Sequence, residues 1–282
     1  MQRSFRRFGP AASLLLLAPF LLLTLIVFIL PLGVLLRESL FVPELGLAHY
    51  ARVFDQPVYL RVMGRTLRIA AIVTACTLLL AYPLAMVMAR ARGWLLAVLV
   101  LCVMLPLWTS VLVRTYAWVV LMQRNGLINQ ILVATGLAGE PQRLLYTEGA
   151  VILAMVHVLL PFMVLPLWST LRAVPPDYAR AAAMLGAGPW RVFARVTWPL
   201  SLPGVASGCL MVFLLALGFF VTPSLVGGPQ QMMISTLISQ QVRELLNWPF
   251  AGALVGCLLV STLALVAVFS RFLRLDRFVP SR

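Results

Sequence analysis

The residues of this chain that are able to do chemistry are few and dispersed. The two histidines, His49 and His157, lie far apart in the sequence, and no motif surrounds either of them. Four cysteines lie inside apolar segments without the spacing of metal ligands, so we interpret them as small packing residues. They are Cys76, Cys102, Cys209 and Cys257. The sequence therefore predicts no catalytic residue, no metal site and no cofactor in this chain.

The basic residues exclude further classes of site. All 22 are arginine, and without lysine the chain cannot contain a Gly-rich phosphate-binding loop that ends in lysine. No pair of carboxylates and no Ser-His-Asp arrangement occurs. The net charge of +14 would suit a nucleic-acid partner, but the arginines are scattered at the ends of apolar segments, which is typical of membrane topology signals. The energy for any active transport must then come from another subunit or from an ion gradient.

The most informative polar stretch is residues 172–204, between two apolar segments that are long enough to cross a bilayer. It contains four arginines and one acid, Asp177. Its centre, residues 178–185, is rich in alanine, and an alanine-faced helix can pack closely into a groove on another protein. The alternative is an ordinary basic loop held near lipid headgroups.

Capping residues divide this stretch into two short helices. Prolines at 175–176 end the preceding membrane helix, because proline disfavours the α conformation of the residue before it. Asp177 is the expected N-cap of the first short helix, and Gly186 is its expected left-handed stop. Gly188 and Pro189 are the expected N-cap and first position of the second helix.

The small residues of this stretch resemble the EAA loop of ABC-importer permeases, which carries the coupling helix. The residues that match are Ala181-Ala182, Gly186-Ala187, Phe193, Val196 and Pro199. The resemblance implies that the loop docks on an ATPase subunit, and that a β-branched residue at Gly186 would uncouple transport from ATP hydrolysis. The residues assigned to this ATPase-coupling loop are Asp177, Arg180, Ala181, Ala182, Gly186, Ala187, Pro189 and Trp190. The chain departs from the family at Arg180, where glutamate is usual, so a salt bridge to the ATPase is not carried over.

Composition and length predict a polytopic membrane protein with essentially no soluble domain. Of the 282 residues, 62% are hydrophobic and 11% are charged, and the mean hydropathy is +1.01. We predict an all-α polytopic membrane protein with six transmembrane helices. The expected spans are residues 11–36, 66–89, 94–122, 149–171, 202–221 and 250–270. The third is long enough for a tilt or a break near Pro106, and an amphipathic helix is expected outside the membrane at 232–246. The first span is too long for a cleaved signal peptide.

The distribution of arginine predicts that both termini are cytoplasmic. The segments assigned to the cytoplasm hold 13 arginines against two acids, whereas the other 9 arginines share their segments with six acids. Residues 1–64 then form an N-terminal tail, the first transmembrane helix and a periplasmic loop. Residues 65–270 form the transmembrane domain, with the coupling loop at about 172–200, and residues 271–282 form a cytoplasmic tail.

Several further segments resemble spermidine/putrescine-type ABC permeases. They are ARVFDQPVYLRVMGRTLRIA and YPLAMVMAR around the second span, RNGLINQ after the third, LPFMVLPLWSTL in the fourth and GFFVTPSLVGGP after the fifth. The resemblance implies the type I ABC importer transmembrane fold in a bacterial inner membrane. The implied partners are ATP-binding subunits (two), a second permease subunit and a periplasmic substrate-binding protein. The implied substrate is a polyamine, although relatives of this class also handle ferric iron, thiamine and phosphonates.

The same resemblance implies that the third, fourth and fifth spans line the translocation path. The candidates, chosen by position and chemistry, are Trp108, Thr109, His157, Phe219, Phe220 and Thr222. For His157 a helix–helix hydrogen bond is the alternative. Arg114 is interpreted as a side chain that snorkels to the membrane interface, with a pathway role as the alternative. A polyamine path would favour carboxylates and aromatic faces, yet the spans contain no Asp or Glu. Either the second permease subunit supplies acids, or the substrate is not a polyamine.

A stand-alone secondary carrier or channel is the second hypothesis, and it needs no ATPase. A proton-coupled carrier usually has an acid in mid-membrane, and the absence of one disfavours this class. A membrane-anchored scaffold is disfavoured because nothing in the sequence forms a soluble recognition module.

Overall fold

The computed structural model describes residues 10–41 and 45–273, and the regular structure of these residues is entirely helical. Within them, five continuous helices are long and apolar enough to cross a membrane, and one bent pair of helices brings the number to six. The prediction of an all-α polytopic membrane protein is confirmed. The predicted terminal tails, residues 1–10 and 271–282, lie almost wholly outside the described residues.

The chain divides into two compact units, and the smaller one is formed by Met1–Pro57 together with Ile238–Leu259. Its helices are α1 (Pro10–Thr24), η1 (Leu25–Ile29), α2 (Leu30–Phe41), α3 (Ala48–Asp55), the end of α13 (Ile234–Arg243) and the first half of α14 (Trp248–Leu273). The first three are continuous, with η1 as a wider helical turn. The first span therefore reaches Phe41 rather than ending at residue 36 as predicted.

Two glycines let α14 lie close to α2 and α3 in this unit. A β-carbon added at Gly252 would lie 3.0 Å from the β-carbon of Ser39, and one added at Gly256 would lie 2.8 Å from the hydroxyl of Tyr50. Ser39 donates a hydrogen bond to the Leu36 carbonyl, so it accepts the one that joins it to Tyr50, with 2.9 Å between the oxygens. Small residues at four-residue spacing are a common means of close helix packing in membranes.

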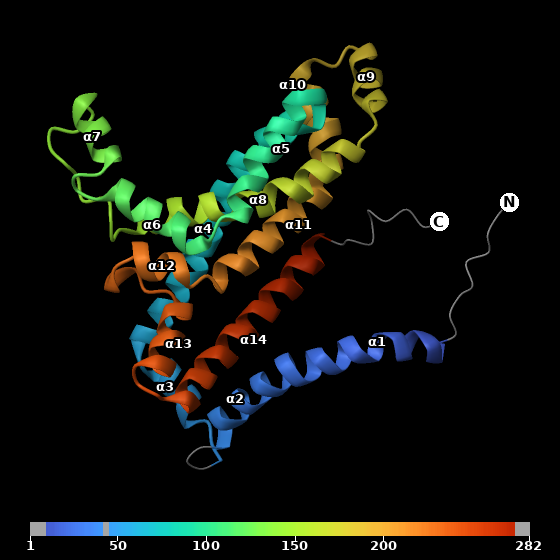
Figure 1. Ribbon diagram of the computed structural model, residues 1–282. Helices are drawn as coiled ribbons and strands as arrows, with labels where there is room; N and C mark the ends of the chain where they lie inside the picture. The colour runs from blue at the N-terminus through green and yellow to red at the C-terminus, as the bar shows by residue number, and fades with distance from the viewer. Residues whose placement is uncertain (1–9, 42–44, 274–282) are drawn as a thin grey trace. The chain divides into compact units, whose positions relative to one another are not determined.

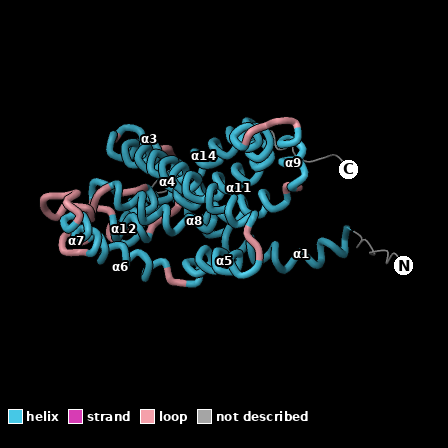
Figure 2. The backbone as a smooth tube through the Cα atoms, turned by 90° about the horizontal axis from the view of Figure 1, so that it is seen from above, coloured by secondary structure: helices cyan, strands magenta, loops and turns pink. Residues whose placement is uncertain are grey.

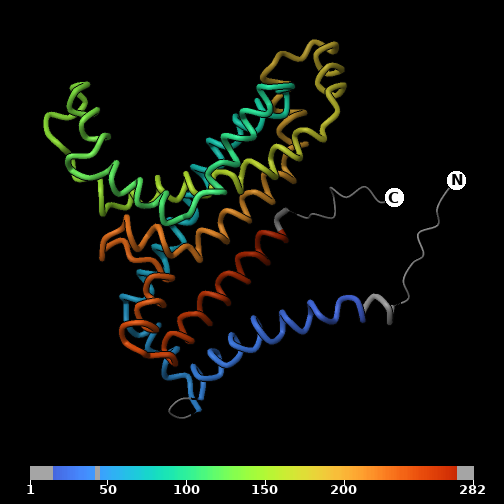
Figure 3. The backbone as a smooth tube through the Cα atoms, in the orientation of Figure 1, coloured from blue at the N-terminus to red at the C-terminus, as the bar shows by residue number. Residues whose placement is uncertain are grey.

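The larger unit is formed by Val58–Leu237 and Val260–Arg282. Its helices are α4 (Pro57–Arg90), α5 (Gly93–Trp108), α6 (Val111–Met122), α7 (Leu127–Ala134), α8 (Glu148–Ala173), α9 (Pro176–Met184), α10 (Pro189–Val192), η2 (Phe193–Thr197), α11 (Trp198–Leu217), α12 (Val221–Val226) and η3 (Pro229–Gln231). Helix α8 lies at the centre of this unit, with α11 alongside it (Figures 1 and 3). Helices α9 and α10 lie at one end of this pair, and α7 and α12 lie at the other (Figures 1 and 2).

The core of the larger unit is built around α8. Met155, Leu159 and Met163 are fully buried on α8 and belong to one cluster with buried residues of α4 and α11. Gly204 and Gly208 on α11 lie very close to α8. A β-carbon added at Gly204 would lie 2.6 Å from Thr170 Oγ1, and one added at Gly208 would lie 2.7 Å from Met163 Sδ. This G-x-x-x-G spacing lets two backbones approach without intervening side chains, so α8 and α11 form a tightly packed pair.

Two of the membrane helices are interrupted. Helix α5 ends at Trp108, and the next helical segment, Val111–Ala134, leaves it at an angle of 97°, which confirms the predicted break near Pro106. The Thr109 hydroxyl donates to the Pro106 carbonyl at 2.9 Å and closes the end of α5. The second interruption separates α11 from α12 and was not predicted, because residues 202–221 were expected to form one span. Irregular backbone at membrane depth is tolerated where protein or a water-filled cavity surrounds it.

Helices α4 and α11 begin earlier than predicted. The polar stretch before residue 66 was expected to be an external loop, but α4 starts at Pro57, a residue type that fits the first helical position because its missing N–H needs no partner there. The helical segment that contains α11 starts at Pro189 rather than at residue 202. The wider turn η2 continues the helix into α11, where Pro199 occupies the first turn. The predicted amphipathic helix is confirmed as α13, with shorter bounds.

Candidate functional site

The predicted coupling loop ends its first helix with a left-handed glycine. Gly186 has φ +82°. Its N–H donates to the Ala183 carbonyl at 3.0 Å, and the N–H of Ala187 donates to the Ala182 carbonyl at 3.1 Å. This is the Schellman arrangement, in which the two residues after the helix cap its last carbonyls. The prediction of Gly186 as the stop of this helix is confirmed.

The start of the same helix differs from the prediction. The N-cap is Pro175, and Asp177 lies in the first turn of α9 without a capping hydrogen bond. Pro176 occupies the first helical position, where its missing N–H costs nothing, so the helix begins before Asp177 can cap it. The Asp177 carboxylate instead accepts from Arg180 at 3.3 Å, and both side chains are largely exposed. The second short helix begins as predicted, with Gly188 as N-cap and Pro189 at the first position.

Several large apolar side chains of the loop are exposed. Met184 and Leu185 are each 89% exposed, Trp190 is 75% exposed and Tyr178 is 54% exposed. Ala181 and Gly186 are also exposed, whereas Ala182 and Ala187 are half-buried. The sequence analysis proposed the small residues as the docking surface and missed Met184 and Leu185. Two large apolar residues at the end of a helix in an otherwise polar loop were the signal.

An aromatic chain connects this loop to the membrane helices. The ring of Trp190 stacks on Phe193, with centroids 5.4 Å apart, and Phe193 meets Tyr82 of α4 edge-on at 5.9 Å. The Tyr82 hydroxyl lies 2.9 Å from the hydroxyl of Ser201 on α11, inside the protein. The loop is therefore joined by side chains to α4 as well as by backbone to α8 and α11.

The predicted path residues cluster at the two helix breaks. Trp108 and Thr109 lie at the break between α5 and α6, and Phe219, Phe220 and Thr222 lie at the break between α11 and α12. Thr222 is buried, and its hydroxyl lies 3.0 Å from that of Thr115 on α6. Trp108 is 78% exposed. The structure thus brings Thr222 against α6 and leaves Trp108 on the surface of this chain.

The second break is held by a contact that is remote in sequence. The Ser235 hydroxyl on α13 donates to the carbonyl of Phe219 at 2.7 Å. At the start of α13 the N–H of Ile234 donates to the buried hydroxyl of Thr66 on α4 at 2.8 Å. The first bond satisfies a carbonyl at the interruption, and the second satisfies a free N–H at the start of α13. Ser235, which the sequence analysis did not single out, therefore holds the α11–α12 break, and Thr66 holds the start of α13 against α4.

His157 makes the helix–helix hydrogen bond that was the alternative to a pathway role. The indole N–H of Trp118 on α6 donates to Nδ1 of His157 on α8 at 3.1 Å. Because Nδ1 accepts, the ring is the neutral tautomer with its proton on Nε2. The bond joins the bent helix α6 to the central helix α8.

Arg114 is half-buried in this chain, and its snorkelling to the membrane interface stays a prediction. It lies in the first turns of α6, and its Nε and Nη1 atoms are buried without a hydrogen-bond partner. No ion pair of Arg114 occurs among the described residues. The region around the α5–α6 break therefore combines a neutral imidazole, an indole and one uncompensated guanidinium.

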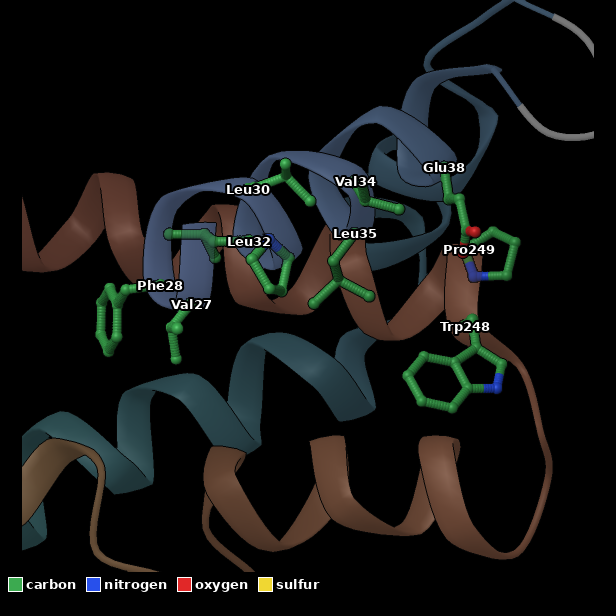
Figure 4. A pocket seen from close by; sticks show the side chains of 10 residues that line it. Val27, Phe28, Leu30, Leu32, Val34, Leu35, Glu38, Trp248 and Pro249 are labelled. Atoms are coloured by element: carbon green, nitrogen blue, oxygen red, sulfur yellow. The ribbon is translucent and has the colours of Figure 1, made fainter. Parts of the chain in front are cut away.

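No other part of the described chain offers a better chemical site. No group of three or more His, Cys, Asp or Glu residues is arranged to hold a metal ion within the described residues. The smaller unit contains an open groove of about 1010 Å³ between the first helix and the start of α14 (Figure 4). Its lining is apolar apart from Glu38, so it suits lipid or apolar protein rather than a polar solute.

The comparisons with known proteins give the same fold. The family model described as "Binding-protein-dependent transport system inner membrane component" matches residues 81–276. The spermidine/putrescine transport system permease protein PotB of Salmonella typhimurium (strain SL1344) is 36% identical over 207 residues, which cover 73% of this chain and 72% of that protein. The molybdenum transport system permease protein ModB of Mycobacterium bovis is 36% identical over 203 residues, which cover 72% and 75% of the two chains.

A solved structure of a bacterial alginate ABC transporter, in complex with an alginate pentasaccharide-bound periplasmic protein, has the same chain fold. The TM-score is 0.76 at 19% identity, and the match covers 95% of this chain and 96% of that one. At this identity the likeness concerns the fold.

Proposed function

Since the chain belongs to the family of binding-protein-dependent transport system inner membrane components, we propose that it is the permease subunit of an ATP-driven importer whose solute is a polyamine. It is a multi-pass inner-membrane protein. The chain itself hydrolyses nothing, and ATP hydrolysis belongs to partner subunits. The full assembly contains two ATP-binding subunits, a second permease subunit and a periplasmic substrate-binding protein.

The observation that carries this proposal is the exposed apolar tip of the coupling loop. Met184 and Leu185 are almost fully exposed beside a rigid glycine turn, at the end of the central α8–α11 pair. Side chains of this kind are expensive to leave in water and are typical anchors of protein interfaces. An ATPase groove that takes them up would hold the loop by its tip, with Arg180 and Asp177 at the rim.

The proposed mechanism follows from how the loop is attached. ATP binding closes the two ATPase subunits, and the loop moves with the surface on which it is docked. The movement passes directly into α8 and α11 and, through Trp190, Phe193 and Tyr82, into α4. The interruptions after α5 and α11 lie toward the other end of the unit, where a helix segment can turn without disturbing the packed pair. Access to the path then alternates around these breaks.

The polyamine assignment rests on the relatives and on the aromatic residues at the breaks. Phe219 and Phe220 offer π faces for ammonium groups, and the spermidine/putrescine permease of Salmonella typhimurium is 36% identical. Both termini are proposed to be cytoplasmic, from the arginine distribution. This places the coupling loop in the cytosol and the α7 end of the unit toward the binding protein. The domain boundaries proposed from the sequence, with the transmembrane domain at 65–270, are retained.

The test is purification from native membranes in mild detergent, through a tag on the C-terminus. We expect an ATP-binding subunit and a second permease to co-purify, and we expect the reconstituted complex to take up spermidine when its binding protein and ATP are present. A chain that is recovered alone, under conditions that preserve a known importer of this class, would instead support the stand-alone carrier. Uptake of another solute only would contradict the polyamine assignment and leave the importer assignment intact.

A further inference from the structure

We propose that Arg114 receives a carboxylate of the second permease subunit at an interface formed by α5 and α6. This inference rests on the proposed function, because it requires a second permease. It goes further by naming the residue through which the two permeases meet electrostatically. It also names the place at which a carboxylate of the second permease would reach the translocation path, to which this chain contributes no carboxylate.

The first step is the state of Arg114 in this chain. Nε and Nη1 are buried and have no hydrogen-bond partner among the described residues, while the residue as a whole is half-buried, which leaves the guanidinium within reach of a group outside this chain. A guanidinium remains charged at all ordinary pH values, so it cannot escape the cost of burial by losing its proton. Charges inside a membrane protein are therefore nearly always paired, and an unpaired one marks a site where a partner is missing.

The second step is that the neighbouring side chains of this chain offer no anion. Polar side chains of α6 and of the helices packed against it are engaged with one another: Trp118 donates to His157, and Thr115 bonds to Thr222. His157 is neutral because its Nδ1 accepts. The two ion pairs within the described residues use their acids elsewhere, with Glu148 bound to Arg68 and Asp177 bound to Arg180 in the coupling loop.

The position on the helix increases the demand for an anion. Arg114 lies in the first turns of α6, whose N-cap, Ser110, makes no side-chain hydrogen bond. The start of a helix carries a partial positive charge, which disfavours a cation there and favours a negative group. Arg114 and the start of α6 therefore add to the same positive potential.

The third step is the surface beside Arg114. Large apolar side chains are exposed along the end of α5 and the outer face of α6, a pattern that marks a lipid or protein contact. They are Leu105, Trp108, Leu112, Val113, Tyr116 and Val120. Lipid tails would cover such a face but would leave the guanidinium without a partner. A permease that packs there and contributes one Asp or Glu would satisfy both the apolar face and the charge.

The solute itself is the other conceivable source of an anion, and the proposed substrate argues against it. A polyamine carries only amine groups and would be repelled by Arg114. Its passage requires acids, and the helices proposed to line the path have none between their ends. A partner carboxylate held by Arg114 beside the α5–α6 break would place an acid where it is needed. Arg114 is then a positioning residue, which acts on the solute through the carboxylate that it orients.

The experiment compares three variants in the complete complex. Arg114→Gln removes the charge, Arg114→Lys keeps it, and Arg124→Gln removes an exposed arginine just beyond α6 as the matched control. We expect Arg114→Gln to lower the recovery of the second permease with the tagged chain at least tenfold after a mild heat step. We expect Arg114→Lys to retain most of it and Arg124→Gln to behave as the unmodified complex. Equal recovery with Arg114→Gln and Arg124→Gln would overturn the proposal.

A charge reversal identifies the source of the carboxylate. Arg114→Glu should break the complex. The complex should form again when the Asp or Glu that pairs with Arg114, in a membrane span of the second permease, is changed to arginine. Failure of every such reversal would overturn the proposal. A pair of results would also overturn it: the Arg114→Gln complex stays intact, and the unmodified transporter takes up molybdate rather than spermidine. The anion that Arg114 binds would then be the solute. The absence of any second permease or ATPase from the unmodified preparation would refute the proposed function instead.

Discussion

The left-handed turn at Gly186 gives the sharpest prediction about the coupling loop. Gly186 has φ +82°, and no atom lies within 4 Å of the place that a β-carbon would occupy. A new side chain there meets open space, so its whole cost comes from the backbone. For an L-residue the left-handed conformation costs roughly 1–2 kcal/mol, and a β-branched residue adopts it least readily. In Gly186→Thr the observed loop should therefore become about 5–30-fold less populated relative to other conformations.

A matched control lies two residues away. Gly188 is equally open, but its φ of −68° and ψ of 166° suit any residue. It is the N-cap of α10, a position at which threonine and glycine are about equally favourable, so Gly188→Thr should leave the loop unchanged. Gly186→Asn should retain most of the coupling, because asparagine tolerates the left-handed region better than other non-glycine residues.

The assay measures spermidine uptake and ATP hydrolysis by the same reconstituted complexes. In Gly186→Thr we expect the solute imported per ATP hydrolysed to fall, by at most about 5–30-fold as estimated from the backbone cost. Gly188→Thr should match the unmodified complex. Equal coupling in Gly186→Thr and Gly188→Thr would show that the shape of this turn does not matter, and it would refute the docking role inferred for the loop.

Three further changes test other parts of the structure. Gly204→Val places carbon atoms against Thr170 and the backbone of Pro166. Thermal unfolding in detergent should therefore show a free energy of unfolding that is lower by about 1–3 kcal/mol. The control, Gly64→Val, meets nothing within 4 Å and should lower it much less. Leu185→Ser should weaken the binding of the ATPase by about 2 kcal/mol, or about 30-fold. It should not lower the melting temperature of the chain, because Leu185 is 89% exposed. Tyr82→Phe removes the bond to Ser201 and should cost about 0.5–1.5 kcal/mol in the same melt; an unchanged melt would show that this bond contributes nothing.

The features that the sequence predicted are those that depend on local chemistry. Apolar runs of bilayer length define the spans, and Gly186 and Gly188 have the conformations that a stop and a cap require. The error at Asp177 is also local. Aspartate is a strong N-cap, but a proline at the first helical position, Pro176, fixes the start of the helix two residues earlier, and the two preferences compete in the run Pro175-Pro176-Asp177.

The features that the sequence did not predict depend on contacts between distant residues. The break after Leu217 is followed by Pro223, whose missing N–H leaves the Phe219 carbonyl without a helical donor. The donor that replaces it, the hydroxyl of Ser235, lies 16 residues away from Phe219 and was not predicted. Neither the 97° angle of the bend after Trp108 nor the burial of Nε and Nη1 of Arg114 was predicted. A sequence can suggest that a helix breaks near a proline, but it does not give the direction in which the next segment leaves.

The arrangement of tight and interrupted packing bears directly on how such a permease could move. The α8–α11 pair is held by Gly204 and Gly208 at distances that leave no room for sliding, so a force applied at the coupling loop should displace both helices together. The elements that can turn independently are the short segments beyond the breaks, α6 and α12, which are joined by the Thr115–Thr222 contact. Because α6 also carries Arg114, a turn of this pair would change the position of any carboxylate bound there. We therefore expect the interface with the second permease to shift together with access to the path.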